Sequence, residues 1–453
     1  MLRIGQLNIA SGAHCSRREL IRAGSLSLCG LSLAEMLRAQ PNRSTPAKSV
    51  ILLWLWGGPS HLDTFDMKPN ASVEYRGPYS PISTSNPGVS ICELLPSLAA
   101  RADRYSIIRS LHCESNDHGI AGTIGLTGSQ AGAISLGGQT IAGDLQPTHG
   151  SVISKIHGFS PGIPRFLTLG GDLHQGHKHI TGEGGGILGP LHDPFRLDYD
   201  PQTGVKIPHL DLIDGLSPSG IDSRERLLAQ LDLLSRRIDR SPRMERLDQF
   251  YQQAFSLLTD ARAKEVFDLE RESEVTRRQY GKFRFGQCCL LGRRLIEAGA
   301  RFVQVNWSSH VEPVEDTGDG GWDMHDRNFQ QFQDRHAWML DQSVSALLDD
   351  LEQRAMLDET IVVAIGEFGR TPKINDKSGR DHWNQCYSGL VAGGGIQPGR
   401  VIGSSDERGE HPTSNPVTPA DLFTTVLGQL GISSPELTGA GLLPLGKSIE
   451  ELL

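Results

Sequence analysis

The sequence of 453 residues lacks a long apolar run, is poor in cysteine and has no excess of basic residues. A membrane-spanning helix needs about 18 or more consecutive apolar residues, and no such stretch occurs, so we expect no membrane span in the mature chain. The formal net charge of −9 at pH 7 argues against a nucleic acid partner. The seven cysteines include no CxxC pair, which excludes a structural zinc ribbon.

Glycine and proline are plentiful by contrast, at 52 and 25 residues, and they indicate many ordered loops rather than a helical bundle. The chain is long enough to bury a large core. It shows no internal repeat and no low-complexity tract. We therefore expect a large α/β unit.

Residues 1–40 carry the most readable local signal. Arg17 and Arg18 precede a weakly apolar run that extends to about Leu37, a pattern that resembles a twin-arginine export signal. An amphipathic helix is the alternative, but the mixture of Gly, Ser and Leu makes a poor helix face. The segment predicts the twin-arginine translocase as a partner and a periplasmic or extracellular location.

Strand-like and helix-like segments alternate along the rest of the chain. We predict strands at 49–56, 106–110, 164–171, 300–307, 361–365 and 387–396, and helices at 221–300, at 328–355 and after Thr418. Several of the strands are continuous apolar runs, which are typical of a mostly parallel sheet covered on both faces.

Polar side chains follow four of these strands, where ligands gather in sheets of this kind. Each group alone is weak evidence, because loops are polar by default. Four groups at the same edge of a sheet are much less expected by chance. Mixed carboxylates and imidazoles suit one or two divalent ions. We expect zinc or manganese first, and calcium or magnesium next. The predicted metal ligands are His61, Asp63, Asp323, His325, Glu367, Asp381 and His382.

Two segments resemble the alkaline phosphatase and sulfatase superfamily. "LLDDLEQRAMLDETIVVAIGEFG" is similar to the stretch that ends in the superfamily's metal-binding Asp-His-Gly, with Glu367 in place of the aspartate and Phe368 in place of the histidine. "HGIAGTIGLTG" has the shape of the sulfatase nucleophile segment, and His118 stands at the nucleophile's position. The sulfatase Cys-x-Pro-Ser-Arg is absent, which excludes formylglycine chemistry.

A closer resemblance covers nearly the whole chain. Through "WGGPSHLDTFDMKP", "GILGPLHDPF", "FGQCCLLGRRLIEAG", "GWDMHDRN" and "GEFGRTPKIN", the sequence is identified as a member of the exported bacterial family called domain of unknown function 1501. The resemblance implies an alkaline-phosphatase-like three-layer αβα sandwich over residues 47–446, with a mostly parallel central sheet and a helical insert at about 221–300. It conveys fold more than activity.

The resemblance also implies a metal-dependent hydrolase of phosphate or sulfate esters, with a small-molecule or polysaccharide ester as substrate. His118 would be nucleophile, general acid or ligand, Arg370 and Arg380 would clamp an anionic group, and Asp117 would contact substrate. The alternative for the arginines is a surface salt bridge, and the alternative for His118 is a buried imidazole that holds Asp117.

Two readings without turnover stay open. A degenerate family member would bind carbohydrate or a protein partner, since the usual nucleophile is missing. A metal store would use the run of His174, His177 and His179, for which a solvated loop is the plainer explanation.

Overall fold

The computed structural model describes residues 46–160, 162–206, 265–313, 320–442 and 446–453. The predicted signal segment and the part of the predicted helical insert before residue 265 lie outside these ranges. The described end of that insert holds η3 (Leu269–Arg271), α10 (Glu274–Tyr280) and α11 (Arg284–Glu297). None of the helices in the described ranges combines the length and apolarity needed to cross a bilayer.

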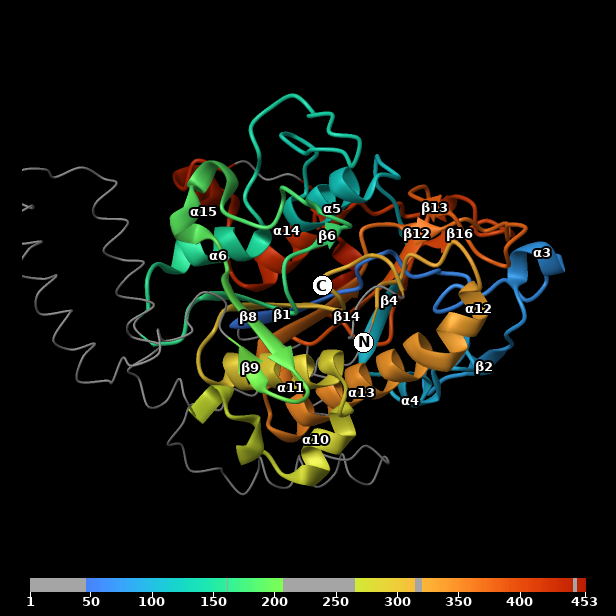
Figure 1. Ribbon diagram of the computed structural model, residues 1–453, viewed down its shortest axis with the longest axis horizontal. Helices are drawn as coiled ribbons and strands as arrows, with labels where there is room; N and C mark the ends of the chain where they lie inside the picture. The colour runs from blue at the N-terminus through green and yellow to red at the C-terminus, as the bar shows by residue number, and fades with distance from the viewer. Residues whose placement is uncertain (1–45, 161, 207–264, 314–319, 443–445) are drawn as a thin grey trace, which may run out of the picture. The chain divides into compact units, whose positions relative to one another are not determined.

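A sheet of nine strands forms the centre of the fold (Figure 1). Its strand order is β15-β4-β14-β11-β1-β10-β5-β8-β9. The strands are β1 (Ser49–Trp54), β4 (Tyr105–Leu111), β5 (Phe166–Leu169), β8 (Phe195–Asp200), β9 (Gly204–Lys206), β10 (Phe302–Asn306), β11 (Thr360–Ile365), β14 (Tyr387–Ala392) and β15 (Val401–Ile402).

Most neighbouring strands run parallel, as predicted. β1 pairs in parallel with both β10 and β11, so that Leu53 lies opposite Val305 on one side and Ala364 on the other. β14 is antiparallel to its neighbours β11 and β4, and β9 is antiparallel to β8. The sheet is therefore mixed, with a parallel majority.

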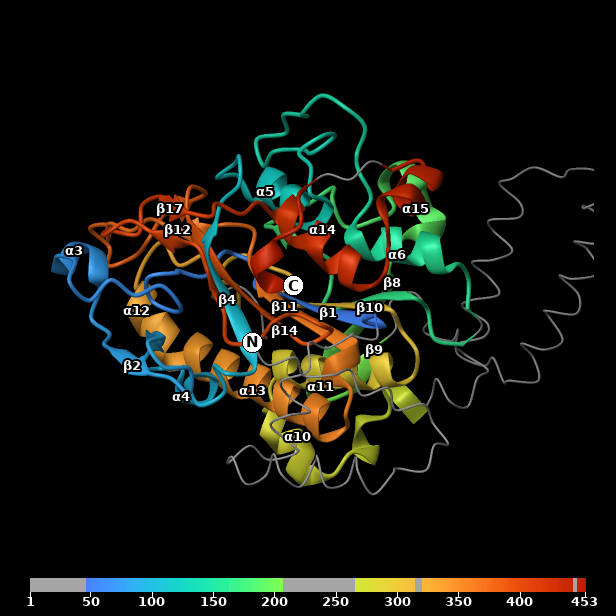
Figure 2. The same cartoon turned by 180° about the vertical axis from the view of Figure 1, so that it is seen from behind.

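Helices cover both faces of the sheet, which confirms the predicted three-layer architecture (Figures 1 and 2). Ile51 and Leu53 of β1 belong to a core shared with α4 (Pro96–Ala99), α10, α11 and α13 (Ala337–Gln353). Val50 and Leu52 belong to a second core shared with α5 (His118–Thr127), α6 (His149–His157), α14 (Pro419–Gln429) and α15 (Ser434–Gly439). The alternation along β1 follows from the two-residue period of a strand whose faces are both buried.

Shorter elements complete the fold. They are α3 (Val73–Arg76), α12 (Asn328–Gln331) and the two-stranded pairs β2–β3 (Pro81–Ser83, Ser90–Cys92), β6–β7 (His174–Gln175, Lys178–His179), β12–β13 (Gly369–Arg370, His382–Trp383) and β16–β17 (Ser404–Ser405, Pro412–Ser414). Short 3-10 turns lie at η1 (Gly186–Leu188), η2 (Pro190–His192), η5 (Leu357–Glu359) and η6 (Glu450–Leu452).

Two helix predictions have different outcomes. The predicted helix start at Thr418 is confirmed, because the Thr418 side chain and Asp421 cap each other's backbone N–H groups and Pro419 follows. The predicted single helix over 328–355 is interrupted by a π-helical turn at Phe332–His336 and ends at Gln353. Within that turn, the imidazole Nε2 of His336 contacts the carbonyl of Gly321 at 2.8 Å, and the ring is buried.

Candidate metal centre

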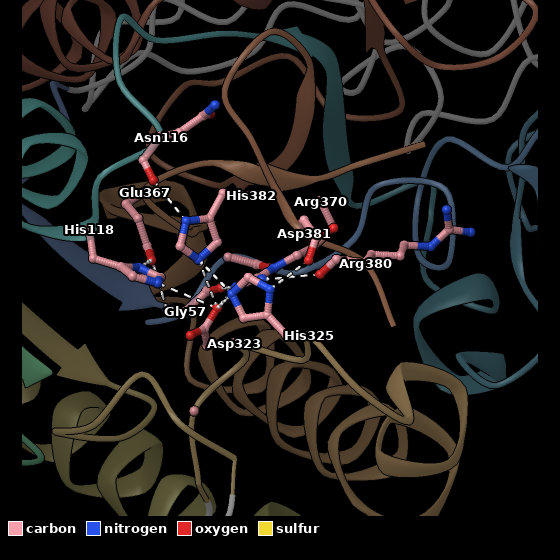
Figure 3. A network of polar contacts seen from close by, with 12 residues as sticks. Gly57, Asn116, His118, Asp323, His325, Glu367, Arg370, Arg380, Asp381 and His382 are labelled. Atoms are coloured by element: carbon pink, nitrogen blue, oxygen red, sulfur yellow. Dashed lines mark hydrogen bonds and ion pairs between the residues drawn. The ribbon is translucent and has the colours of Figure 1, made fainter. Parts of the chain in front are cut away.

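The polar groups predicted after four strands do arise at one edge of the sheet. β1, β10 and β11 are parallel, and β4 runs in the same direction as β11 because both are antiparallel to β14. The carboxyl ends of these four strands therefore meet at the edge from which β14 starts. The loops after β4, β10 and β11, together with β13 just before β14, bring His118, Asp323, Glu367 and His382 to this edge (Figure 3).

His118 is the first residue of α5, and the helix holds it against the end of β1. Asp117 is the N-cap, and its carboxylate accepts the N–H of Ile120 at 3.1 Å. A Cβ at Gly125 would lie 2.3 Å from the ring of Trp54, so a glycine is needed for α5 to pack this closely on β1. The His118 ring contacts Trp56 at a centroid distance of 5.4 Å.

Three imidazole Nε2 atoms converge on one carboxylate oxygen. The Oδ1 atom of Asp323 lies 3.0 Å from Nε2 of His325, 3.0 Å from Nε2 of His382 and 3.4 Å from Nε2 of His118. Figure 3 shows the three rings directed at Asp323. We call these four residues the His–Asp cluster.

The other nitrogen of each ring faces a hydrogen-bond acceptor. Nδ1 of His118 lies 2.6 Å from Oε1 of Glu367, and Nδ1 of His325 lies 2.8 Å from Oδ1 of Asp381. Nδ1 of His382 lies 2.8 Å from the carbonyl oxygen of Asn116. Since these acceptors cannot donate, each Nδ1 carries the hydrogen, and in the neutral ring each Nε2 presents a lone pair.

Lone pairs that face one another at short range need a cation or a proton between them. Nε2 of His325 and Nε2 of His382 are 2.9 Å apart, and Nε2 of His118 is buried without a hydrogen-bond partner. Two nitrogens bound to one tetrahedral zinc ion at about 2.0–2.1 Å lie about 3.3 Å apart. One ligand atom each from His118, Asp323 and His382 lies within 4.8 Å of the others. The cluster thus fits a divalent ion.

Charge favours a cation here as well. The carboxylates of Asp323, Glu367 and Asp381 face the guanidinium of Arg370, which leaves two formal negative charges uncompensated when the three imidazoles are neutral. Arg370 donates from Nη2 to Oδ1 of Asp323 at 2.6 Å. Burial would raise the pKa of Asp323, but Arg370 and the three imidazoles hold it far below its usual range.

The three histidines differ in their affinity for a proton. Burial works to lower the pKa of His118, yet the neighbouring carboxylates of Asp323 and Glu367 prevail and raise it to about 9. Burial lowers the pKa of His382 to about 4, while the hydrogen bond with Asp323 raises the pKa of His325. Positive charge is therefore favoured most strongly at His118, deep in the cluster.

The cluster is most exposed to solvent at His325. The side chains of His118 and Glu367 are 0% exposed, whereas those of His325 and Asp381 are 43% and 54% exposed. A ligand from solvent would therefore approach past His325.

Glu367 and Asp381, two of the predicted ligands, lie behind the imidazoles. Both oxygens of Glu367 accept the backbone N–H of Gly57, at 3.0 and 3.2 Å, in addition to the His118 ring. The structure thus places these carboxylates where they orient histidines, the outer-shell arrangement that metal sites commonly use.

Other predicted site residues belong to different networks. Asp63 accepts from Nε and Nη2 of Arg380, at 2.8 and 3.1 Å, and from Asn328. His61 contacts the carbonyl of Gly409 at 2.8 Å, and burial lowers its pKa to about 4. The structure does not bring Asp63 or His61 into the His–Asp cluster.

Neither predicted arginine clamp presents its guanidinium to solvent. Arg370 is fully buried and donates to the carbonyls of Gly57, Gly58 and Arg380 as well as to Asp323. Arg380 is also fully buried and donates to Asp63 and to backbone carbonyls. Surface salt bridges, the alternative explanation, do not describe these buried groups either. The Asp117 carboxylate, predicted to contact substrate, is used as a helix cap.

Several contributors to the site carried no readable signal in the sequence. The carbonyl of Asn116 and the N–H of Gly57 are backbone groups, so their side chains do not reveal them. Phe368 packs against the rings of His118 and His382, at centroid distances of 4.8 and 4.7 Å. The sequence had marked Phe368 only as the residue that stands in place of a histidine in the resemblance.

The comparison with protein families agrees with the motifs. The model described as "Protein of unknown function (DUF1501)" matches residues 47–443. The chain belongs to the DUF1501 family. A search of curated proteins finds no match.

Solved structures similar to this DUF1501 chain include a sulfatase, a phosphonate monoester hydrolase and an alkaline phosphatase. PsFucS1 sulfatase from Pseudoalteromonas sp. is 12% identical, with a TM-score of 0.40, over 96% of this chain and 77% of that one. The phosphonate monoester hydrolase SpPMH from Silicibacter pomeroyi is 12% identical, with a TM-score of 0.38, over 89% and 76%. A mutant of TAB5 alkaline phosphatase with Mg bound is 9% identical, with a TM-score of 0.37, over 86% and 99%.

Proposed function

We propose that this chain is a metal-dependent hydrolase that binds one divalent ion through His118, Asp323, His325 and His382 and cleaves phosphate or sulfate esters. The observation that carries the proposal is the convergence of three imidazole Nε2 atoms on one carboxylate oxygen. Nitrogen donors outnumber oxygen donors in this set, so zinc fits it better than calcium or magnesium.

The residues of the chain would prepare the site before substrate arrives. Glu367, Asp381 and the Asn116 carbonyl fix the three rings, and Arg370 fixes Asp323. A bound divalent ion would polarise the ester and lower the pKa of a water molecule. The exposed side of His325 and Asp381 is where water and ester would enter.

The geometry favours attack by water over a covalent enzyme intermediate. None of the described hydrogen-bond and ion-pair partners of the four cluster side chains is a hydroxyl or a thiol. Cys113 contacts the backbone of Glu367, but burial raises the pKa of its thiol to about 12. His118 uses Nδ1 for Glu367 and turns Nε2 into the cluster, which supports a role as a metal ligand.

Phe368 supports a site for one ion rather than two. It occupies the position of the superfamily's histidine ligand, is fully buried and packs on both His118 and His382. A second ion beside the first would meet an aromatic ring where it needs a donor.

Metal analysis and a substrate panel test the proposal together. We expect purified protein dialysed against zinc or manganese to retain tight metal at the cluster, and His325→Ala to lose it, because His325 supplies one of three nitrogens. His411→Ala is the matched control, since His411 is also exposed but packs on Trp383. Hydrolysis of phosphate or sulfate esters should disappear with a chelator and return with the ion. Equal metal content in wild type and His325→Ala would overturn the proposal.

A binding protein without turnover is the second candidate. One observation favours it: Arg370 and Arg380, the predicted anion clamps, are buried and engaged with protein groups. Bound metal with no hydrolysis of any ester in the panel would select this candidate, which would then bind carbohydrate or a protein partner.

We also propose export to the periplasm or the cell exterior through the twin-arginine signal in residues 1–40. Arg17→Lys with Arg18→Lys should retain the protein in the cytoplasm, as cell fractionation would show. Unchanged export of that variant would contradict the proposal.

A further inference from the structure

A second group of histidines lies beside the candidate metal centre, on the hairpin β6–β7 and the loop after β10. His174 of β6 pairs with His179 of β7 in antiparallel register. On its other side His174 forms a parallel bridge with His310, and its N–H donates to the carbonyl of Ser309 at 2.9 Å. Three short segments thus form a small ladder with one histidine on each.

Directly opposite residues of a β-ladder extend from the same face. The rings are accordingly in contact: His174 is 4.1 Å from His310 and 5.2 Å from His179, measured between ring centroids. We call these three residues the histidine row.

The backbone of the row is fixed by its surroundings. The indole N–H of Trp56 donates to the carbonyl of His174 at 3.1 Å, and the backbone N–H of Leu173 donates to Glu183 at 2.9 Å. The Trp56 ring contacts His118 on its other side. The row is therefore anchored next to the His–Asp cluster but separated from it by an indole ring.

The central imidazole has a defined tautomer. Nδ1 of His174 lies 2.8 Å from the carbonyl of Gly176, and because a carbonyl only accepts, Nδ1 carries the hydrogen and Nε2 presents a lone pair. Burial and the neighbouring His310 and His179 lower the pKa of His174, although the Gly176 carbonyl and Asp172 work to raise it. This repeats the tautomer of the three cluster histidines.

We propose that His174, His179 and His310 form a second metal site, for a zinc- or copper-class ion. Imidazole is the preferred ligand type for these ions. The Asp172 carboxylate, which acts on His174, is paired with Arg196 at 2.6 Å. The donor atoms of the three rings do not all lie within 4.8 Å of one another, so the exposed His179 ring would turn toward an ion held by His174 and His310. Water would complete the coordination.

The row differs from the run of histidines visible in the sequence. His177 belongs to that run, but it lies at the exposed turn between β6 and β7. His310 takes its place from a segment more than 130 residues further along the chain. His177 is therefore a matched control within the same hairpin.

The test is a copper(II) titration of the full chain, followed by electron paramagnetic resonance and equilibrium dialysis. We expect a binding equivalent that survives in His325→Ala, shows coupling to imidazole nitrogen, and weakens at least tenfold in His310→Ala and in His174→Ala. His177→Ala should leave its affinity unchanged. Thermal unfolding in chelator checks that the variants fold, and the exposed His179→Ala replaces any that does not.

The outcomes separate the two sites. If one bound copper ion is lost only in His325→Ala, that ion binds at the His–Asp cluster. If one bound copper ion is lost only in the His174→Ala, His179→Ala or His310→Ala variants, it binds at the histidine row. The second site is refuted if the His325→Ala protein binds no copper, or if the row variants and His177→Ala bind it equally well.

Discussion

Glu367 and Asp381 show how much the role of a carboxylate depends on the atom it faces. Both were predicted as ligands because they stand beside histidines at the end of a strand. In the structure each contacts Nδ1 of an imidazole whose Nε2 is directed to Asp323. Asp323 reaches the centre because Gly57 leaves room for its backbone: a Cβ at Gly57 would lie 2.5 Å from the N atom of Asp323.

Glu367→Gln tests the orienting role of this carboxylate. The amide oxygen can still accept from His118, but the amide N–H group would then face the N–H of Gly57, so the ring is held less well. We expect metal affinity at the cluster to fall by about 10–100-fold, measured by competition with a chromogenic chelator. Glu407→Gln, at an exposed glutamate, is the control. Unchanged affinity would mean that Glu367 does not position His118.

Gly57→Ala tests the close approach. Gly57 has φ of +107°, and a Cβ added there would lie 2.5 Å from the backbone N of Asp323. Gly88 has φ of +83°, and a Cβ added there would meet no atom within 4 Å. We expect Gly88→Ala to lower the free energy of unfolding by about 1–2 kcal/mol through backbone strain alone. Gly57→Ala should lower it by about 2–6 kcal/mol, because overpacking is added. Urea unfolding measures both, and equal losses would contradict the packing argument.

Among the elements, α5 positions two of the predicted site residues. His118 is its first residue and Asp117 is its N-cap. The Asp117 carboxylate accepts the N–H of Ile120 and the N–H of Leu136. It thereby ties the start of the helix to the loop that follows it.

Substitutions at Asp117 distinguish a cap from a substrate contact. Asn is as good an N-cap as Asp, while Ala costs about 0.5–2 kcal/mol. We expect Asp117→Ala to lower the free energy of unfolding by about that amount and Asp117→Asn to change it by less than half as much, measured by urea unfolding. A stable Asp117→Ala protein that loses only ester affinity would support the predicted substrate contact instead.

The strands, and the edge of the sheet at which the site residues lie, were predictable from the sequence. Apolar runs such as 361–365 are long enough to mark buried strands, and polar residues at their ends mark the rim. The antiparallel direction of β14 was not predictable, because a buried strand reads the same in both directions. The π-helical turn at Phe332–His336 also escaped prediction, since the apolar spacing of a helix continues across it.

The sequence predicted several residues of the candidate site, but not the role that each one has there. His325, Asp323 and His382 were predicted as ligands from residue type and position. His118 stayed open between three roles until its two nitrogens were located. His61 and Asp63 have the right chemistry, but their partners, the Gly409 carbonyl and Arg380, depend on contacts more than 300 residues away in sequence.

At the scale of the whole molecule, several buried imidazoles make the fold sensitive to acid. His149 begins α6, stacks on Phe423 of α14 at 3.7 Å, and is 6% exposed. Burial lowers its pKa to about 3. Burial also lowers the pKa of His61 and of His336, each to about 4. The two helices thus pack around an imidazole that stays neutral.

His149→Phe should make the protein less sensitive to acid. Between pH 6.5 and about pH 3 the unfolded chain binds a proton at His149 that the folded chain does not. The contribution of neutral His149 to stability is therefore complete above pH 6.5 and is lost as the pH falls, by about 1.4 kcal/mol per pH unit. Urea unfolding at pH 6.5 and 4.5 should show about 2–3 kcal/mol less loss in His149→Phe than in wild type or in His177→Phe. Equal losses would contradict a depressed pKa.

The position of β14 determines when the site can form during synthesis. β14 lies between β4 and β11, and it comes after both in the chain. Until residues 387–392 leave the ribosome, β4 has no partner strand in the central sheet, and α5 with His118 has no completed layer on which to rest. An ion that needs His118 together with His382 can therefore enter only after β14 has been made.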